Sequence, residues 1–223
     1  MKLINLEKIF ENKYNHLLIG EILLMMLYPV LKSYEVKFPV AGCLFLMAII
    51  PALHVVLPFK VFLPLMSFAV FGLVLRLLVY FQVFAVEHEV GLITFIDVSY
   101  AVFVFLAIVA LVRKILSREV ITADTIKGRV SVYFLIGLLW TFLYMIAFRI
   151  NPNTFSHIND ETVDCFYYSF ATLTTLGPGD ISPTSVYTKF LAILEAFVGQ
   201  VYLAIFIAIL IGLHLGQRIR GTK

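Results

Sequence analysis

Long apolar runs separated by short polar segments dominate the hydrophobic pattern of this chain. Six of these runs fall at roughly residues 17–31, 38–57, 61–85, 90–116, 131–149 and 187–215. A helix of about 20 apolar residues crosses the hydrocarbon core of a bilayer. Because lipid offers no hydrogen-bond partner to the backbone, segments that cross it in this pattern must be helical. The pattern therefore predicts an all-α membrane protein with six transmembrane helices.

A shorter apolar run, at residues 162–173, lies between the fifth and sixth of these helices. It is too short to span a bilayer. It ends directly at a threonine- and glycine-containing segment, residues 174–180, which reads Thr-Thr-Leu-Gly-Pro-Gly-Asp. Irregular backbone at membrane depth occurs only where protein buries it or where it lines a water-filled cavity. We therefore expect a re-entrant pore helix followed by a loop.

The composition supports a membrane location and indicates an orientation. Hydrophobic residues make up 61% of the chain and charged residues 14%, which is too apolar for a soluble domain. If the N-terminus is cytoplasmic, most Lys and Arg residues fall on the inner side, as the positive-inside rule requires. Those at or beyond the outer face are Lys32, Lys37, Arg149 and Lys189. We expect a multi-pass protein of the cell membrane with both termini in the cytoplasm.

A polar segment at residues 117–130 divides the chain into two units. Residues 1–116 form a four-helix peripheral domain, residues 117–130 a linker and residues 131–223 a pore domain. A voltage sensor needs several positive residues along its fourth helix. In this chain Asp97 is the only charge of that helix between residues 92 and 112, and Arg113 and Lys114 follow at its cytoplasmic end. The sequence therefore predicts weak or absent voltage dependence.

The segment 174–180 carries the functional signal. Glycines 177 and 179 follow two threonines, and glycine permits the unusual dihedral angles that a loop with carbonyl oxygens facing an ion requires. The candidate filter residues are Thr174, Thr175, Leu176, Gly177, Pro178, Gly179 and Asp180. The chain has one such loop and no internal repeat, so a closed pore requires four copies around a rotational axis. We expect a homotetramer.

From about residue 121 to its end, the chain resembles the pore domain of prokaryotic potassium channels. The whole chain resembles a six-helix member of that tetrameric pore-loop cation-channel family. The matching residues before the filter are Asp164, Tyr167, Tyr168, Ser169, Thr172, Thr174 and Thr175, and those after it are Asp180, Ile181 and Pro183. The resemblance implies that Tyr167 and Tyr168 support the filter and that Gly199 is a hinge of the inner helix. It also implies that a monovalent cation, K⁺, binds at the carbonyls or hydroxyl of Thr175, Leu176 and Gly177.

The filter departs from the Thr-Val-Gly-Tyr-Gly pattern of that family at two positions. Leu176 stands in place of Val and Pro178 in place of Tyr. Proline lacks an N–H and fixes its φ near −65°, and it offers no hydroxyl to the aromatic pair. We expect the outermost ion sites to be altered and the selectivity for potassium to be weaker than in a channel with the usual filter.

Charged residues within the apolar runs form a further group of candidates. Arg76 and Asp97 lie at matching depths on the third and fourth helices, and an unpaired charge in hydrocarbon is costly. We expect an ion pair that holds these helices together. Glu195, one turn before Gly199, is expected to hydrogen-bond behind the filter or the pore helix.

Acidic residues also flank the candidate pore helix. Asp180 closes the filter motif, and Asp160, Glu161 and Asp164 precede the helix. In four copies these residues would form an acidic outer mouth that concentrates cations. Acidic residues also favour a helix N-terminus, so capping is an alternative interpretation of the preceding three. The two interpretations are compatible.

Three functions follow from these observations. The first is a homotetrameric, potassium-permeable cation channel, and the second is a weakly selective or sodium-permeable one. The third is a non-conducting, channel-like membrane subunit in which Pro178 blocks the pore. The expected partners are membrane lipids and monovalent cations, without nucleic acid. No cofactor is implied, and no nucleophile, base or metal cluster indicates an enzyme.

Overall fold

The computed structural model describes residues 14–33, 58–81, 89–116 and 123–221. The long helices within these ranges are α2 (Asn15–Ser33), α4 (Phe59–Tyr80), α5 (Glu89–Leu116), α6 (Ala123–Ile150) and α8 (Val186–Gly221). The expected second transmembrane span, residues 38–57, lies outside the described residues. Four of the described helices are long and apolar enough to cross a membrane, with spans at Phe62–Tyr80, Val90–Leu116, Asp124–Ile150 and Val186–Gly212. This indicates a multi-pass membrane protein.

A short helix lies between the last two spans. Helix α7 runs over Glu161–Leu173, which confirms the helix expected at residues 162–173. The chain between α6 and α7 contains a 3₁₀ turn, η2 (Pro152–Thr154), and a short strand, β1 (Phe155–Ser156). Strand β1 pairs in antiparallel register with β2 (Ser182–Pro183), which follows the candidate filter loop. This strand pair was not expected from the sequence, and it fixes the two ends of the α7–loop segment to each other.

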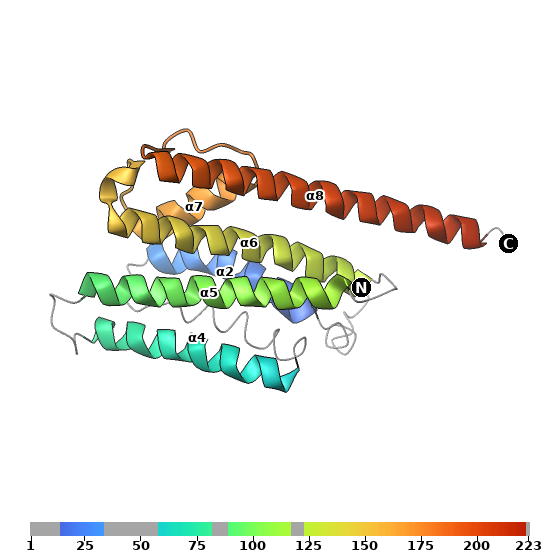
Figure 1. Ribbon diagram of the computed structural model, residues 1–223, viewed down its shortest axis with the longest axis horizontal. Coiled ribbons are helices and arrows are strands. Elements are labelled where there is room, and N and C mark those ends of the chain that lie inside the picture. Colours follow the sequence, from blue (N-terminus) through green and yellow to red (C-terminus); the bar gives the residue numbers. More distant parts are fainter. Residues whose placement is uncertain (1–13, 34–57, 82–88, 117–122, 222–223) are drawn as a thin grey trace.

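The helices pack side by side in an order that separates peripheral from central elements. Helix α5 lies between α4 and α6, α2 packs on α6, and α7 contacts both α6 and α8 (Figure 1). Helices α4 and α6 begin, and α5 ends, at the end of the bundle on the right of Figure 1. The filter loop and the strand pair lie at the opposite end. Among the helices that the structure describes, α6 is the one that packs extensively on the peripheral helices and also on α7 and α8.

Helix α6 begins before the expected fifth span. It starts at Ala123, so residues 123–130, which were expected in the polar linker, are helical. The side chain of Asp124 accepts a hydrogen bond from the backbone N–H of Tyr14 (3.0 Å), and Lys127 Nζ donates to Asn15 Oδ1 (2.9 Å). A Cβ at Gly128 would lie 2.8 Å from the ring of Tyr14. The first turns of α6 therefore pack against and hydrogen-bond to the start of α2.

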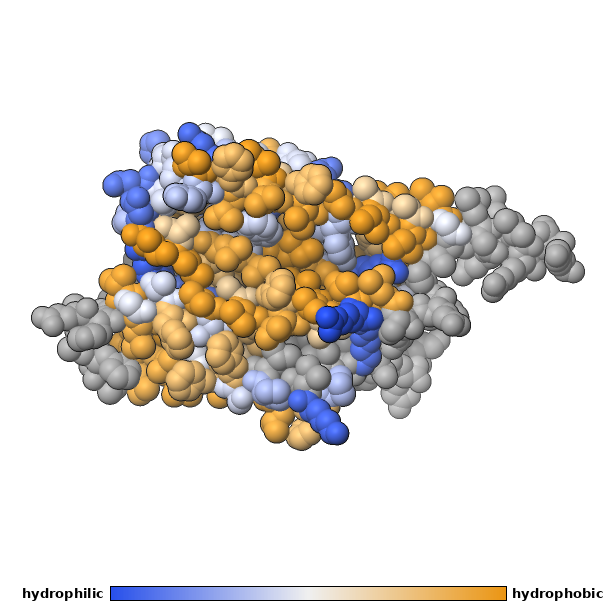
Figure 2. All heavy atoms as spheres, viewed as in Figure 1, coloured by the Kyte–Doolittle hydropathy of each residue, from blue (hydrophilic) through white to orange (hydrophobic). Residues whose placement is uncertain are grey.

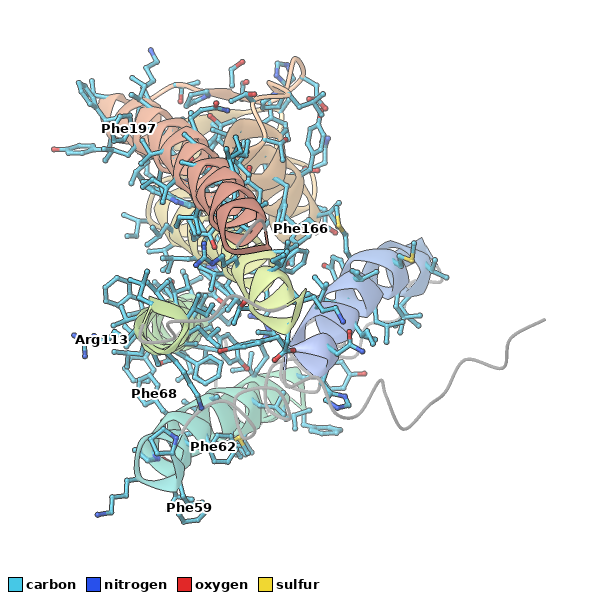
Figure 3. All side chains as sticks on the ribbon, turned by 90° about the vertical axis from the view of Figure 1, so that its right-hand side faces the viewer. Phe59, Phe62, Phe68, Arg113, Phe166 and Phe197 are labelled. Atoms are coloured by element: carbon cyan, nitrogen blue, oxygen red, sulfur yellow. The ribbon has the colours of Figure 1, made fainter. Side chains whose placement is uncertain are left out.

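Apolar side chains cover the outside of the helices. In Figure 2 hydrophobic residues spread over the flanks of the bundle, whereas hydrophilic residues gather at the end where α6, α7 and α8 are connected and, in a smaller group, toward the opposite end. Helix α8 is the most uncovered, since its outward side carries exposed apolar residues such as Phe197 (Figure 3). An apolar surface of this extent requires lipid or another protein chain against it.

Candidate pore loop and its supporting contacts

Two acidic side chains organise the start of α7. Asp160 is the N-cap, and its Oδ1 accepts from the backbone N–H groups of Thr162 and Val163, both at 3.2 Å. Asp164 Oδ2 accepts from the N–H groups of Asn159 (2.6 Å) and Asp160 (2.9 Å). Side-chain oxygens thus satisfy N–H groups that the helix itself leaves open. Capping is therefore the observed role of Asp160 and Asp164.

The candidate filter loop follows α7 without a break. Thr174 Oγ1 donates to Phe170 O (2.6 Å), the Thr175 N–H to Thr172 O (3.0 Å) and the Gly177 N–H to Ala171 O (3.0 Å). Gly177 has a φ of 75°, and Thr175 has a φ of 59°, which is unusual for a residue with a side chain. The hydrogen bonds tie the first half of the loop to the last turn of α7. The conformation of the loop therefore follows the position of that helix.

The loop is open to its surroundings in the single chain. Thr175, Leu176, Gly177, Gly179 and Asp180 are all exposed, and 74% of the surface of Leu176 is accessible. A Cβ placed at either Gly177 or Gly179 would meet no atom within 4 Å. Within the described part of the chain Gln200 approaches Thr175 Oγ1 at 3.5 Å and Tyr167 lies beside Asp180, but the outward side of the loop stays uncovered and is available to an ion or to another copy of the protein.

The two tyrosines expected to support the filter lie in different surroundings. Tyr168 is buried and packs edge-on against Tyr144 and Phe155, with ring centroids 4.9 and 5.0 Å apart. Tyr167 is partly exposed and lies beside Asp180. Desolvation, and after it the Asp180 carboxylate to which the phenol hydrogen-bonds, raise the pKa of Tyr167. Tyr167 is thus the one that reaches the end of the filter, and Tyr168 anchors α7 to α6.

A buried carboxyl group joins α8 to both α6 and α7. Glu195 is fully buried, with Oε2 2.6 Å from Tyr144 Oη and Oε1 2.5 Å from Ser169 Oγ. Ser169 Oγ also lies 2.8 Å from Gly137 O. This is the hydrogen bonding behind the pore helix that was expected of Glu195. Its two partners, Tyr144 and Ser169, were not assigned this role from the sequence, because only the packing of three helices brings them together.

Gly199 lies where α8 passes closest to the end of α7. A Cβ at this position would be 2.5 Å from Leu173 O and 3.0 Å from Leu173 Cδ1. Tyr133 Oη on α6 donates to the same carbonyl at 3.0 Å. In the described structure the need for glycine here is therefore steric. A hinge at this position remains a prediction.

The expected ion pair between α4 and α5 is present, and it belongs to a larger network. Arg76 Nη1 lies 3.2 Å from Asp97 Oδ1. The other carboxylate oxygen of Asp97 pairs with Arg149 at the end of α6, and Arg149 also pairs with Glu161 in the first turn of α7. Asp97 is fully buried. Four charged side chains thus form a continuous connection from the peripheral helices to the start of α7.

Arg149 was expected from the sequence to lie at the outer face, but it was not expected to be part of an ion pair. The sequence offers one signal for it, since Arg149 is a charge at the outer end of an apolar run, and Arg76 and Asp97 lie in the outer half of their own runs. A buried carboxylate with one arginine still has lone pairs for a second donor. Without the packing order of α4, α5 and α6, however, the sequence does not show which arginine supplies it.

Comparison with known proteins gives one match. Residues 130–213 match the model of a family described as ion channels. The match begins within α6 and includes α7, the filter loop and most of α8, hence Glu195, Ser169 and Gly199. No curated protein and no solved structure gives a match. The C-terminal part of this chain is therefore similar to ion channels.

The charge network leads to a first prediction. Replacing Asp97 by Asn removes the charge that faces two arginines, and loss of one partner of a buried ion pair typically costs about 3–5 kcal/mol. We expect a loss near the lower end, roughly 3 kcal/mol, because Arg149 retains Glu161. The measurement is the unfolding free energy of the purified protein in detergent.

The control for this prediction is Arg113→Gln on the same helix. Arg113 is exposed and points away from the bundle in Figure 3, so its loss should change stability by less than about 0.5 kcal/mol. Equal stability of Asp97→Asn and the natural protein would show that the network does not hold the helices together.

The close approach at Gly199 leads to a second prediction. Gly199→Ala places a methyl group against a backbone carbonyl that cannot easily move, and such overpacking costs about 1–3 kcal/mol. Gly212→Ala, on the same helix, meets no atom within 4 Å and should leave stability unchanged or slightly increased. Thermal unfolding of the two variants side by side separates these outcomes, and identical midpoints would contradict the steric role of Gly199.

Proposed function

We propose that this protein is the subunit of a homotetrameric cation channel that conducts through the backbone carbonyls of residues 174–180. The observation that carries this proposal is the placement of the loop. It follows a helix too short to span a bilayer, it is exposed, and it lies beside the uncovered side of α8. The similarity of residues 130–213 to ion channels covers the same segment.

The chemistry of the loop favours a dehydrated monovalent cation. Carbonyl rings replace the hydration shell of K⁺, and several adjacent sites allow conduction by mutual displacement of ions. Thr175, Leu176 and Gly177 would provide the inner sites. Pro178 retains its carbonyl but has a fixed φ and no N–H, so the outer sites would differ. A potassium-permeable channel of reduced selectivity, or one that also passes sodium, fits this loop.

The surface of α8 supports assembly around a central axis. Within its apolar span, Val186–Gly212, only 11% is buried inside the chain. Its exposed apolar residues include Phe190, Ile193, Leu194, Phe197, Val201 and Ile205. Copies of α8 and of the exposed loop could cover one another if four chains meet at these surfaces. As the family resemblance implies, α8 around Gly199 would then form the gate.

The positions of the basic residues support an orientation. Lys60, Arg113, Lys114, Lys127 and Arg129 lie at the end of the bundle opposite the filter loop. The positive-inside rule places that end in the cytoplasm. The filter loop and Asp180 would then face the outside of the cell membrane, where a ring of four aspartates would attract cations.

Flux from liposomes tests the proposed function. Purified protein whose tetrameric state has been verified by cross-linking should release K⁺ down its gradient. Gly177→Ala should reduce that flux strongly, because alanine is strained at a φ of 75° although there is space for its methyl group. Gly212→Ala provides the matched control. No flux from verified tetramers would favour a non-conducting subunit, and another stoichiometry would refute the proposal.

The selectivity of the pore gives a further prediction. Proline at position 178 fixes the backbone φ angle and has no N–H. Pro178→Tyr removes this restriction and adds both an N–H and a hydroxyl. Bi-ionic reversal potentials should then show a severalfold increase in the preference for K⁺ over Na⁺. If the natural protein already discriminates as strongly as the variant, the outer sites are not weakened by proline.

A further inference from the structure

The hydrogen bonds around the Glu195 carboxyl group indicate whether it carries a proton. Its carboxyl group lies at the junction of α6, α7 and α8, fully buried. Tyr144 Oη is 2.6 Å from Oε2, and Ser169 Oγ is 2.5 Å from Oε1. Ser169 Oγ is also 2.8 Å from Gly137 O, a carbonyl that can only accept. Three short oxygen-to-oxygen contacts therefore need three protons.

Tyr144 and Ser169 supply only two of these protons, since each hydroxyl carries one. Tyr144 donates to Oε2 of Glu195. If Ser169 donates to the ionised Glu195, its oxygen faces Gly137 O at 2.8 Å with no proton between them. If Glu195 carries a proton on Oε1, it donates to Ser169 and Ser169 donates to Gly137 O. Only the protonated acid satisfies all three contacts.

The surroundings of Glu195 favour the neutral form as well. Among the residues that the structure describes, no Lys, Arg or His forms an ion pair with it. The titratable groups that face it are Tyr144 and Tyr133 on α6 and Tyr168 on α7, all phenols. A buried carboxylate without a cation is costly, and such groups usually become neutral instead. The arrangement is thus suited to a carboxylic acid.

Ser169 lies one turn before the end of α7, and the backbone of that last turn holds the filter loop. Ala171 O accepts from the Gly177 N–H, and Thr172 O from the Thr175 N–H. A change in the contact between Glu195 and Ser169 would therefore move the helix end from which the loop is held. The protonation state of Glu195 on α8 can therefore affect the conformation of the filter loop through Ser169 and the last turn of α7.

We propose, on the basis of the function proposed above, that Glu195 is a protonated carboxylic acid whose proton joins α8 to Ser169 of α7 and holds the filter loop in its conducting arrangement. Glu195 is a positioning residue, because it acts through Ser169 and does not touch the ion. When the proton is lost at alkaline pH, the bond to Ser169 can persist only if Ser169 gives up Gly137 O. Ion flux then falls.

Infrared difference spectroscopy tests the protonation independently of conduction. The spectrum of the natural protein minus that of Glu195→Gln, at neutral pH in lipid, should contain the carbonyl stretch of a protonated carboxylic acid. The band should disappear as the pH is raised, and it should shift in Ser169→Ala, where the acceptor of the proton is missing. Absence of an acid band at neutral pH would overturn the inference whether or not the protein conducts.

The pH dependence of K⁺ flux from liposomes tests the positioning. Between neutral and alkaline pH on both sides of the membrane, the flux of the natural protein should fall by up to about tenfold, the equivalent of one hydrogen bond. In Glu195→Gln the ratio of the two fluxes should be close to one, because the amide donates and accepts at every pH. Glu195→Ala, which can do neither, should give a low flux at both pH values, whereas Glu195→Gln should keep the flux that the natural protein shows at neutral pH.

The outcomes separate this inference from the proposed function. An acid band in a protein that conducts no ions would refute the channel, and with it the positioning of a conducting loop. An acid band together with a flux ratio that is the same in the natural protein and Glu195→Gln would refute the positioning alone. The inference requires two results. In the natural protein both the acid band and the K⁺ flux should decrease at alkaline pH, and in Glu195→Gln the flux should stay the same at both pH values.

Discussion

The position of α7 depends on satisfying the polar ends of a short helix within an apolar bundle. If α7 lies within the membrane, as the proposed function requires, a helix of thirteen residues cannot reach water at both ends, so protein groups must take the place of solvent. Asp160 and Asp164 cap its first turn, and Tyr133 donates to the carbonyl of Leu173 at its last residue. The filter loop begins at that same carbonyl. The geometry of the loop is therefore a consequence of how α7 is held.

Two polar connections of different kind hold α7 against its neighbours. At its start, Glu161 pairs with Arg149, which also pairs with Asp97 and so links the peripheral helices to α7. Nearer its end, Ser169 contacts Glu195 of α8 without any cation nearby in the described structure. The first connection is ionic and lies close to the polar end of the bundle. The second has no charged partner and, in the arrangement proposed above, depends on the proton of Glu195, which would make it sensitive to pH.

Gly199 shows how one residue type can satisfy different demands. The resemblance to potassium channels implies a hinge, whereas the described structure shows close packing, since any side chain would collide with Leu173 O. The two demands coincide in space. A bend of α8 at Gly199 would change the distance to the end of α7, so movement of the inner helix would reach the filter through the same contact.

Much of this architecture was determined by the sequence itself. Apolar run length fixed the helices because backbone groups in lipid have no other partner, and matching depths paired Arg76 with Asp97 because an isolated charge there is too costly. The glycine and threonine spacing marked the loop that we propose as the filter. Only the tertiary structure decided that Arg149 completes the charge network, that Tyr168 turns away from the loop while Tyr167 meets Asp180, and that Tyr144 and Ser169 surround Glu195. These contacts join residues up to 52 positions apart in the sequence. Which side chains meet depends on how each helix is rotated about its axis. The sequence pattern does not determine that rotation when a helix is apolar on all sides.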